Sequence, residues 1–220
     1  INVLYNMVDR MYIGHIDHVG PDALTGVGVT MPIIMCISAF AALVSMGGAP
    51  QASIHMGKGE MKDAEKILGN CTSMLLMIAA ALTVLFLGFG RPILLMFGAS
   101  EQTIPYAWAY MQIYVCGTIF VQMALGLNAF INAQGFAKIG MMTVAIGAVC
   151  NIILDPVFIF GLHMGVRGAA LATVISQGVS CIWILRFLTG KKTLLKIRRQ
   201  NLRLERRFTG PCLALGLAPF

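Results

Sequence analysis

Long apolar runs separated by short polar connectors are the main pattern along this chain. Five of the runs contain no Lys, Arg or Glu. They cover roughly residues 24–52, 67–90, 104–131, 139–161 and 169–185. A sixth and shorter apolar stretch, residues 1–16, opens the sequence. Because a helix needs about 20 apolar residues to cross the hydrocarbon core of a bilayer, the pattern predicts six membrane-spanning helices, of which the first is incomplete.

Helices are the favoured structure for these runs, because each backbone N–H and C=O group inside a bilayer needs a partner. Strands of a membrane β-barrel would alternate in polarity over about ten residues, whereas these runs are longer and uniformly apolar. Composition agrees, since 11% of the residues are charged and the mean hydropathy is +0.80, against about 25% charged residues in soluble domains. The predicted fold class is an all-α polytopic membrane protein with a six-transmembrane-helix bundle.

The sequence divides into three predicted parts. Residues 1–190 form the bundle, residues 191–209 form a basic loop, and residues 210–220 begin a seventh helix. The last part is too short to cross a bilayer, so we expect the chain to be truncated in both its first and its seventh helix. No basic region precedes the first apolar stretch, so we expect no cleavable signal peptide.

The connectors carry their basic residues unequally. One set contains twelve: Lys58, Lys62, Lys66, Lys138 and eight more within residues 191–207. The opposite set contains Arg91, which opens a short amphipathic piece expected over residues 91–97, and Arg167. Connectors rich in Lys and Arg stay on the cytoplasmic side. The pattern thus predicts a multi-pass protein of the cell membrane whose N-terminus and basic loop are cytoplasmic, with anionic lipid headgroups as the partner of that loop and no nucleic acid.

Two carboxylates, Asp9 and Asp155, lie at membrane depth. Such a group costs about 2.5–3.5 kcal/mol to insert and usually faces an ion or substrate path inside the bundle. Asn151 lies four residues before Asp155, so both lie on one helix face. Their oxygens suit Na⁺ or a proton held on the carboxyl. Pro156 lacks an N–H group, which favours a bend beside Asp155. The alternative is an aspartate that only caps a broken helix or pairs with a polar neighbour.

Other polar residues within the runs are weaker candidates. Asn128 is deep enough to be an interior ligand, whereas Gln134 lies near the helix end and is read as a cap. The Thr173 hydroxyl has an alternative partner in its own helix. His15 and His18 form a weak metal-binding pattern by themselves. The six cysteines lie singly in apolar runs, so we expect neither a metal site nor disulfides.

Six segments resemble the multidrug and toxic compound extrusion (MATE) family in order and spacing over nearly the whole chain. They are Tyr5–Gly14 (YNMVDRMYIG), Ala23–Pro32 (ALTGVGVTMP), Gly57–Lys66 (GKGEMKDAEK), Asn151–Phe160 (NIILDPVFIF), Gly165–Thr173 (GVRGAALAT) and Gly210–Phe220 (GPCLALGLAPF). The first five resemble the N-terminal lobe of the prokaryotic branch, and the last resembles the start of its seventh helix.

The resemblance implies the N-terminal half of a twelve-helix antiporter with two lobes. Such transporters export lipophilic, mostly cationic drugs in exchange for Na⁺ or H⁺, and they use no cofactor. Their partners are the drug, the bilayer and a C-terminal six-helix lobe, which this chain lacks together with the expected proline of helix one. The coupling residues implied are Asp9, Asn128, Asn151, Asp155 and Thr173, with Na⁺ as an option at Asp9, Asn151 and Asp155. Tyr5 and Tyr110 correspond to tyrosines of the substrate cavity.

Two other classes of protein were weighed against the antiporter. A flippase for lipid-linked precursors would need a basic cavity to hold a diphosphate, whereas the deep charges here are acidic apart from Arg10. An intramembrane aspartyl protease would use two aspartates that share a proton, but no G-x-G-D sequence surrounds either one. We therefore predict a transporter and not an enzyme.

Overall fold

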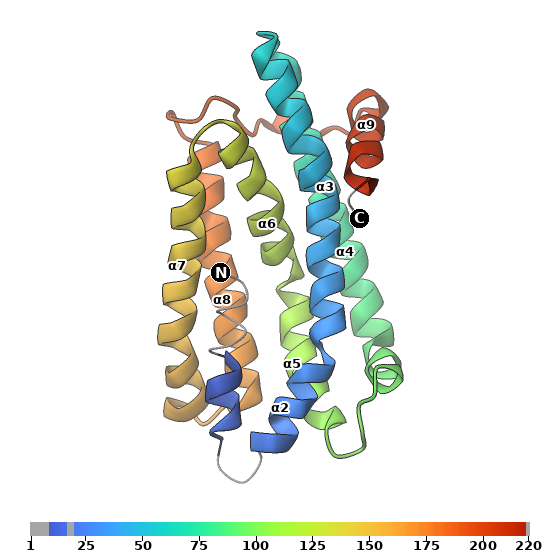
Figure 1. Cartoon of the computed structure of the whole chain (residues 1–220), viewed down its shortest axis with the longest axis vertical. Helices are drawn as coiled ribbons and strands as arrows, with labels where there is room; N and C mark the ends of the chain where they lie inside the picture. Colours follow the sequence, from blue (N-terminus) through green and yellow to red (C-terminus); the bar gives the residue numbers. More distant parts are fainter. Residues whose placement is uncertain (1–8, 17–19, 219–220) are drawn as a thin grey trace.

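The structure, a computed structural model, describes residues 9–16 and 20–218, and no strand occurs in these ranges. Residues 9–14 are helical. The later elements are α2 (Gly20–Val29), α3 (Met31–Gly57), α4 (Met61–Met96), α5 (Ile104–Cys116), α6 (Thr118–Ala133), α7 (Ala137–Pro156), the π-helix η1 (Val157–Gly161), α8 (Val166–Leu188), the 3₁₀-helix η2 (Arg199–Leu202) and α9 (Arg206–Leu217). The long helices lie side by side along one axis (Figure 1).

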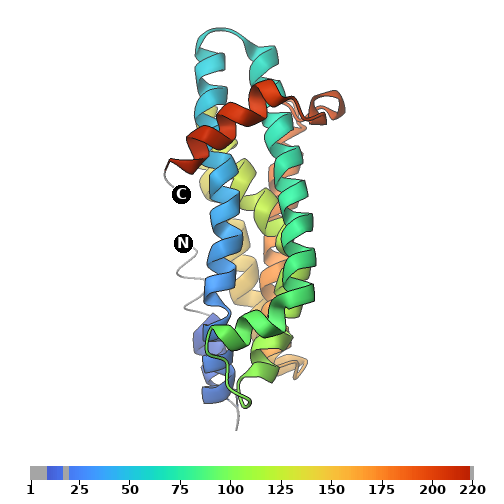
Figure 2. The same cartoon turned by 90° about the vertical axis from the view of Figure 1, so that its right-hand side faces the viewer.

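The bundle is built around α6. This helix packs on α3 and α4 on one side and on α8 on the other, and α8 in turn packs on α7. Figures 1 and 2 show α7 and α8 on one side of the molecule, with α3 and α4 on the other. Small residues allow these close contacts. For example, Gly126 of α6 lies directly against the Leu75 side chain of α4.

The five long apolar runs are confirmed as helices of membrane-spanning length. Four spans are Gly20–Gly57, Met61–Met96, Ala137–Gly161 and Val166–Leu188, and the fifth is the pair α5 and α6, bent by 57°. The bend falls at Gly117, where α8 approaches so closely that a Cβ atom would touch Val174. Most of the first predicted helix lies outside the described residues. The predicted all-helical membrane fold is therefore confirmed for the part of the chain that the structure describes.

The predicted amphipathic piece at residues 91–97 is not a helix of its own, because α4 continues without a break to Met96. Its last part turns away from the bundle axis (Figure 2). Pro92 lies inside this part. A proline inside a helix lacks the N–H group for the usual hydrogen bond, and its ring clashes with the carbonyl four residues earlier, so the helix bends. The amphipathic pattern thus marks a bend in one long helix rather than a new element.

The segment after α8 is held against the bundle by side chains of α4 and α6. Gln134 Oε1 accepts hydrogen bonds from Thr193 Oγ1 (2.8 Å) and from the backbone N–H groups of Leu194 (2.8 Å) and Leu195 (2.9 Å). Ser73 Oγ donates to the Leu202 carbonyl at 2.6 Å. Gln134 therefore does more than cap α6, since it fixes the start of the basic segment.

Further contacts follow in the same segment. Glu65 Oε2 pairs with Arg198 Nε at 3.1 Å, and Asn70 Oδ1 accepts from the Glu205 N–H at 2.7 Å. Helix α9 then begins at Arg206, four residues before the predicted start of the seventh helix.

Replacing Gln134 by Leu should release the start of the basic segment. The backbone N–H groups of Leu194 and Leu195 lose their acceptor, and an unsatisfied donor that is buried, as at Leu195, costs about 1–3 kcal/mol. Since 1.4 kcal/mol corresponds to a factor of ten, we expect trypsin to cleave after Lys191 and Lys192 at least ~10-fold faster than in the wild type. Gln112→Leu, on the exposed face of α5, is the matched control. Equal cleavage rates in the two variants would show that Gln134 does not hold the segment.

Candidate functional site

Two buried aspartates from different helices meet inside the bundle. Asp9 lies at the start of the described helical residues 9–14, and Asp155 is the second-last residue of α7. Their exposed fractions are 3% and 0%. The carboxyl groups are close enough to hydrogen-bond to each other once one of them carries a proton. The structure thus brings together the two acids that the sequence singled out.

Thr173 of α8 joins the two aspartates through Asn151. The Thr173 hydroxyl has two acceptors at 3.0 Å, Asp9 Oδ2 and the carbonyl of Ala169 in its own helix. Asn151 Nδ2 lies 3.2 Å from Asp155 Oδ1 and 3.5 Å from Thr173 Oγ1, and can donate to both. A hydroxyl has one proton, so Thr173 donates to Asp9 or to its own helix, but not fully to both. Four of the five predicted coupling residues therefore form one hydrogen-bonded cluster, which we call the acid cluster (Asp9, Asn151, Asp155 and Thr173).

The backbone beside Asp155 departs from the α-helix. Pro156 has no N–H group to donate to the preceding turn, and the π-helix Val157–Gly161 follows directly. Its closing bond runs from the Leu162 N–H to the Val157 carbonyl at 2.9 Å. π-Bulges of this kind are frequent at functional sites. The predicted bend next to the carboxylate is thus present as a change of helix type.

Three oxygens of the acid cluster are buried without a hydrogen-bond donor among the described residues: Asp9 Oδ1, Asn151 Oδ1 and Asp155 Oδ2. Buried polar atoms almost always have a partner, and each exception requires an explanation. Carboxylate and amide oxygens are the donor atoms that hard cations prefer. The three oxygens are therefore of the chemical kind that binds Na⁺, and a proton held between the two carboxyl groups would give two of them a partner.

A cavity of about 70 Å³ opens beside the acid cluster. Asp9, Asn151 and Thr173 line it, together with Tyr110 and Tyr114 of α5, whose rings stack at 6.0 Å. Tyr110, which the family resemblance assigns to the substrate cavity, lines this cavity, whereas Tyr5 lies outside the described residues. Tyr114 was not predicted as a cavity residue. The signal was present, because Tyr110 and Tyr114 are four residues apart and lie on one helix face.

Two further cavity residues on other helices were not among the predicted site residues. Ser38 of α3 and Gln177 of α8 line the same space. Nothing in the sequence near Ser38 marks it as a cavity residue. In the structure its hydroxyl also donates to the Ile34 carbonyl of its own helix at 3.0 Å. Gln177 lies one turn after Thr173, so it shares the face of α8 that Thr173 presents.

Asn128 does not join the acid cluster. It lines a second cavity of about 30 Å³ between α6, α7 and α8, with Thr143 and Ser180. Its Oδ1 atom is buried and has no hydrogen-bond donor among the described residues. The structure therefore separates Asn128 from the other four predicted coupling residues.

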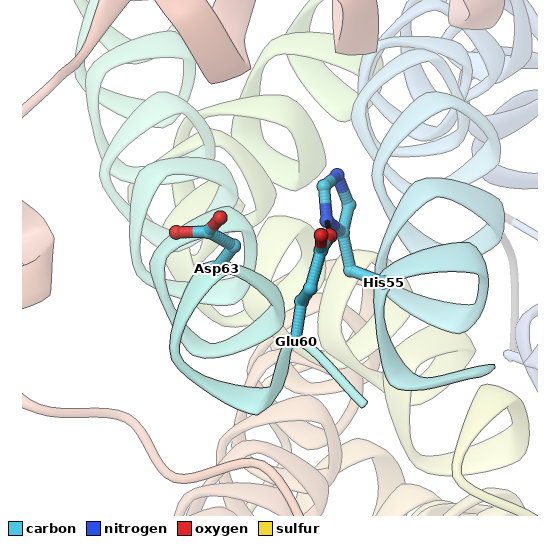
Figure 3. A group of neighbouring side chains, drawn as sticks. All are labelled: His55, Glu60 and Asp63. Atoms are coloured by element: carbon cyan, nitrogen blue, oxygen red, sulfur yellow. Dashed lines mark hydrogen bonds and ion pairs between the residues drawn. The ribbon is translucent and has the colours of Figure 1, made fainter. Parts of the chain in front are cut away.

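One further group of metal-ligand side chains lies far along α3, at its turn to α4. His55 Nδ1 is 2.6 Å from Glu60 Oε2, and Asp63 lies beside them on α4 (Figure 3). Ligand atoms of all three are within 4.8 Å of one another. This hydrogen bond satisfies His55 Nδ1 and Glu60 Oε2 without a metal, and two basic residues, Lys58 and Lys62, lie in the same turn. Of the weak His15 and His18 pattern, His15 Nδ1 hydrogen-bonds to the Met11 carbonyl at 2.6 Å, and His18 lies outside the described residues.

Comparison with known proteins adds a family to this geometry. The chain is 26% identical over all 220 residues to a multidrug export protein, MepA, of Staphylococcus haemolyticus, and 26% identical over 176 residues to a FAD transporter of Shewanella oneidensis. A solved multidrug resistance MATE family transporter of the MOP superfamily, in an inward-facing conformation, superimposes with a TM-score of 0.92 at 26% identity over 99% of this chain.

These proteins are about twice as long as the chain. It spans 48% of the MepA protein, 38% of the FAD transporter and 49% of the solved MATE chain. The MatE family model matches residues 1–157, which contain Asp9, Asn151 and Asp155. The membrane-spanning helices and the fold agree with this match. The chain belongs to the MatE family of membrane transporters.

Proposed function

We propose that this chain forms the cation-coupling half of a drug efflux antiporter in the cell membrane. Influx of Na⁺ or H⁺ would drive export of lipophilic, mostly cationic compounds, and a second six-helix lobe would complete the transporter. One observation carries the proposal: two buried carboxyl groups on separate helices, linked through Thr173, leave three buried oxygens without donors. Multidrug export by the relative MepA supports the drug as cargo.

The acid cluster couples ion and drug only if the ion binds two conformations with different affinity. A univalent cation between Asp9 and Asp155 cancels one of their two negative charges, removes most of their mutual repulsion and draws the helix of Asp9 toward α7. Without it, the two negative charges repel each other, and Asp9 is free to pair with a cationic drug in the adjoining cavity. The stacked rings of Tyr110 and Tyr114 give that cavity an aromatic wall, which attracts organic cations. Cation and drug would thus compete for Asp9.

The two alternatives from the sequence analysis gain no support from the site. No Lys or Arg is among the described residues that line the cavity at the acid cluster, whereas a flippase would need basic side chains for a diphosphate. A protease would need both aspartates open to water and to a peptide, but Asp155 is fully buried behind Asn151. The antiporter is therefore the function that we propose.

The proposal is tested by transport of ethidium, a fluorescent cation. The full-length gene product is expressed in a host without its own efflux pumps, and export is followed with a Na⁺ gradient at fixed pH and with a proton gradient alone. Export that follows one of the two gradients, and stops when that gradient is collapsed, is the expected result. With the protein present in the membrane, no export under either gradient would overturn the proposed function.

A further inference from the structure

The cavity at the acid cluster and the cavity at Asn128 are neighbours that share two lining residues, Leu125 and Gln177. Their volumes are about 70 and 30 Å³. A polar cavity of roughly 15 Å³ or more has room for a water molecule, so each of them can be hydrated. Polar groups also line both, which is the condition for water to remain there.

Gln177 stands at the boundary between the two cavities. In α8 it lies one turn after Thr173 and one turn before Ser180, so the three side chains follow one helix face. At 1.5 Å per residue, this polar row is about 10 Å long. The Gln177 amide forms no hydrogen bond with any side chain or backbone group of the described residues. Its donors and its acceptor are thus free for water or an ion.

The row continues toward the end of the bundle that carries the basic segment. Asn128 Oδ1 is buried and lacks a donor, and Asn132, one turn further along α6, is exposed. Both amide oxygens face Gly140 of α7, where an added Cβ atom would lie 3.3 Å from Asn128 Oδ1 and would collide with Asn132 Oδ1. Because glycine has no side chain, Gly140 makes room for both amide groups between α6 and α7.

We propose that Gln177 and Asn128 form a hydrated polar route through which the coupling cation passes between the acid cluster and the basic end of the bundle. The route rests on the proposed antiport function. It runs from Thr173 past Gln177 to Asn128 and leaves at the exposed Asn132, beside Gly140. In the proposed orientation this end is cytoplasmic, so the route releases the cation that has entered from outside. Asn128 then acts as a step on the ion path and not as a ligand of the acid cluster.

Accessibility to Ag⁺ tests the route without any transport. Ag⁺ is a univalent cation that reacts with thiols. The six cysteines are replaced, and single cysteines are placed by Gln177→Cys, Asn128→Cys and, as a control, Ile153→Cys, which lies on the outer face of α7 with 57% exposure. Ag⁺ is applied from the basic side of the membrane, and unreacted thiols are alkylated after denaturation. We expect the thiols of Gln177→Cys and Asn128→Cys to react at least tenfold faster than the thiol of Ile153→Cys. Equal rates would contradict the proposed route.

A larger side chain at Gly140 should block the route, and ethidium export then shows whether transport depends on it. Gly140→Val enters the space that the Asn128 and Asn132 amides occupy, and the fold should tolerate it because the nearest atom, Asn132 Oδ1, ends an exposed, flexible side chain that can turn away. We expect gradient-driven ethidium export to fall at least tenfold while equilibrium ethidium binding stays within twofold of the wild type. Gly88→Val, at a glycine with no atom near its Cβ position, should leave both unchanged.

Three outcomes can be told apart. Export by Gly140→Val at the wild-type rate contradicts the route while leaving the antiporter intact. Loss of both export and binding means that the valine has damaged the fold, and the Ag⁺ experiment then decides. Absence of export in the wild type overturns the proposed function instead, and Ag⁺ accessibility still shows whether the hydrated path exists.

Discussion

Asp155→Asn in the full-length protein is expected to reduce gradient-driven ethidium export to background while the protein stays in the membrane. Asparagine has almost the same shape as aspartate and can still bond to Asn151, so the local packing at this fully buried position survives. It carries no negative charge, so the acid cluster loses one of its two carboxylates, and the side chain at position 155 can neither attract a cation by charge nor exchange a proton. Ethidium export and immunoblots of the membrane fraction provide the measurement.

Asp63→Asn is the matched control, because Asp63 lies near the start of α4 at the exposed turn, away from the acid cluster. It should export ethidium at the wild-type rate. Asp9→Asn should match Asp155→Asn, and the double variant should be no worse than either, since residues of one network act together and their effects do not add. Export that persists in Asp155→Asn would remove this aspartate from the coupling mechanism.

Gly47→Val is expected to give the largest loss of stability, by separating α9 from α3. A Cβ atom on Gly47 would fall on the carbonyl group of Cys212 in α9, and one on Gly216 would fall on the Leu43 carbonyl. Backbone atoms cannot swing aside as a side chain can, so one helix has to move. Overpacking typically costs about 1–3 kcal/mol, which corresponds to a drop of roughly 2–12 °C in Tm for a chain of this length. Thermal unfolding in detergent measures it.

Alkylation of Cys212 shows whether the loss of stability in Gly47→Val comes from displacement of α9. Cys212 is fully buried and lies 3.9 Å from Cys71, sulfur to sulfur. If α9 moves away, Cys212 should be alkylated several-fold faster. Gly57→Val in the same helix α3 has no atom near its Cβ position and serves as the control. A Tm that is unchanged in Gly47→Val would mean that the contact between α3 and α9 contributes little to stability.

Periodicity and polarity determined the membrane class and the spans. The five long runs became helices because a bilayer offers no other partner for their backbone groups, and the spans do not depend on how the helices pack. The pairing of Asn151 with Asp155 was also available from the sequence, since four residues bring two side chains to one helix face. Their hydrogen bond of 3.2 Å is the direct result of that spacing.

Local patterns gave less reliable information where a helix bends or ends. Residues 91–97 have the amphipathic pattern of a separate piece, but α4 continues through them to Met96. The start of α9 at Arg206 likewise lies within the basic stretch. In both places the helix extends past a basic residue, Arg91 in α4 and Arg206 in α9, because helix length is set by backbone hydrogen bonds and not by hydropathy.

Only the tertiary structure decided which helices meet at the acid cluster. The hydrogen bond from Thr173 to Asp9 joins residues 164 positions apart, and no local spacing specifies such a contact. The same holds for Asn128, which lies deep in α6 as predicted but faces the second cavity with Thr143 and Ser180. The sequence by itself therefore determined that this protein spans a membrane and carries buried acids. The packing of α6, α7 and α8 decided which polar groups share a cavity, because that depends on how the helices are rotated against one another.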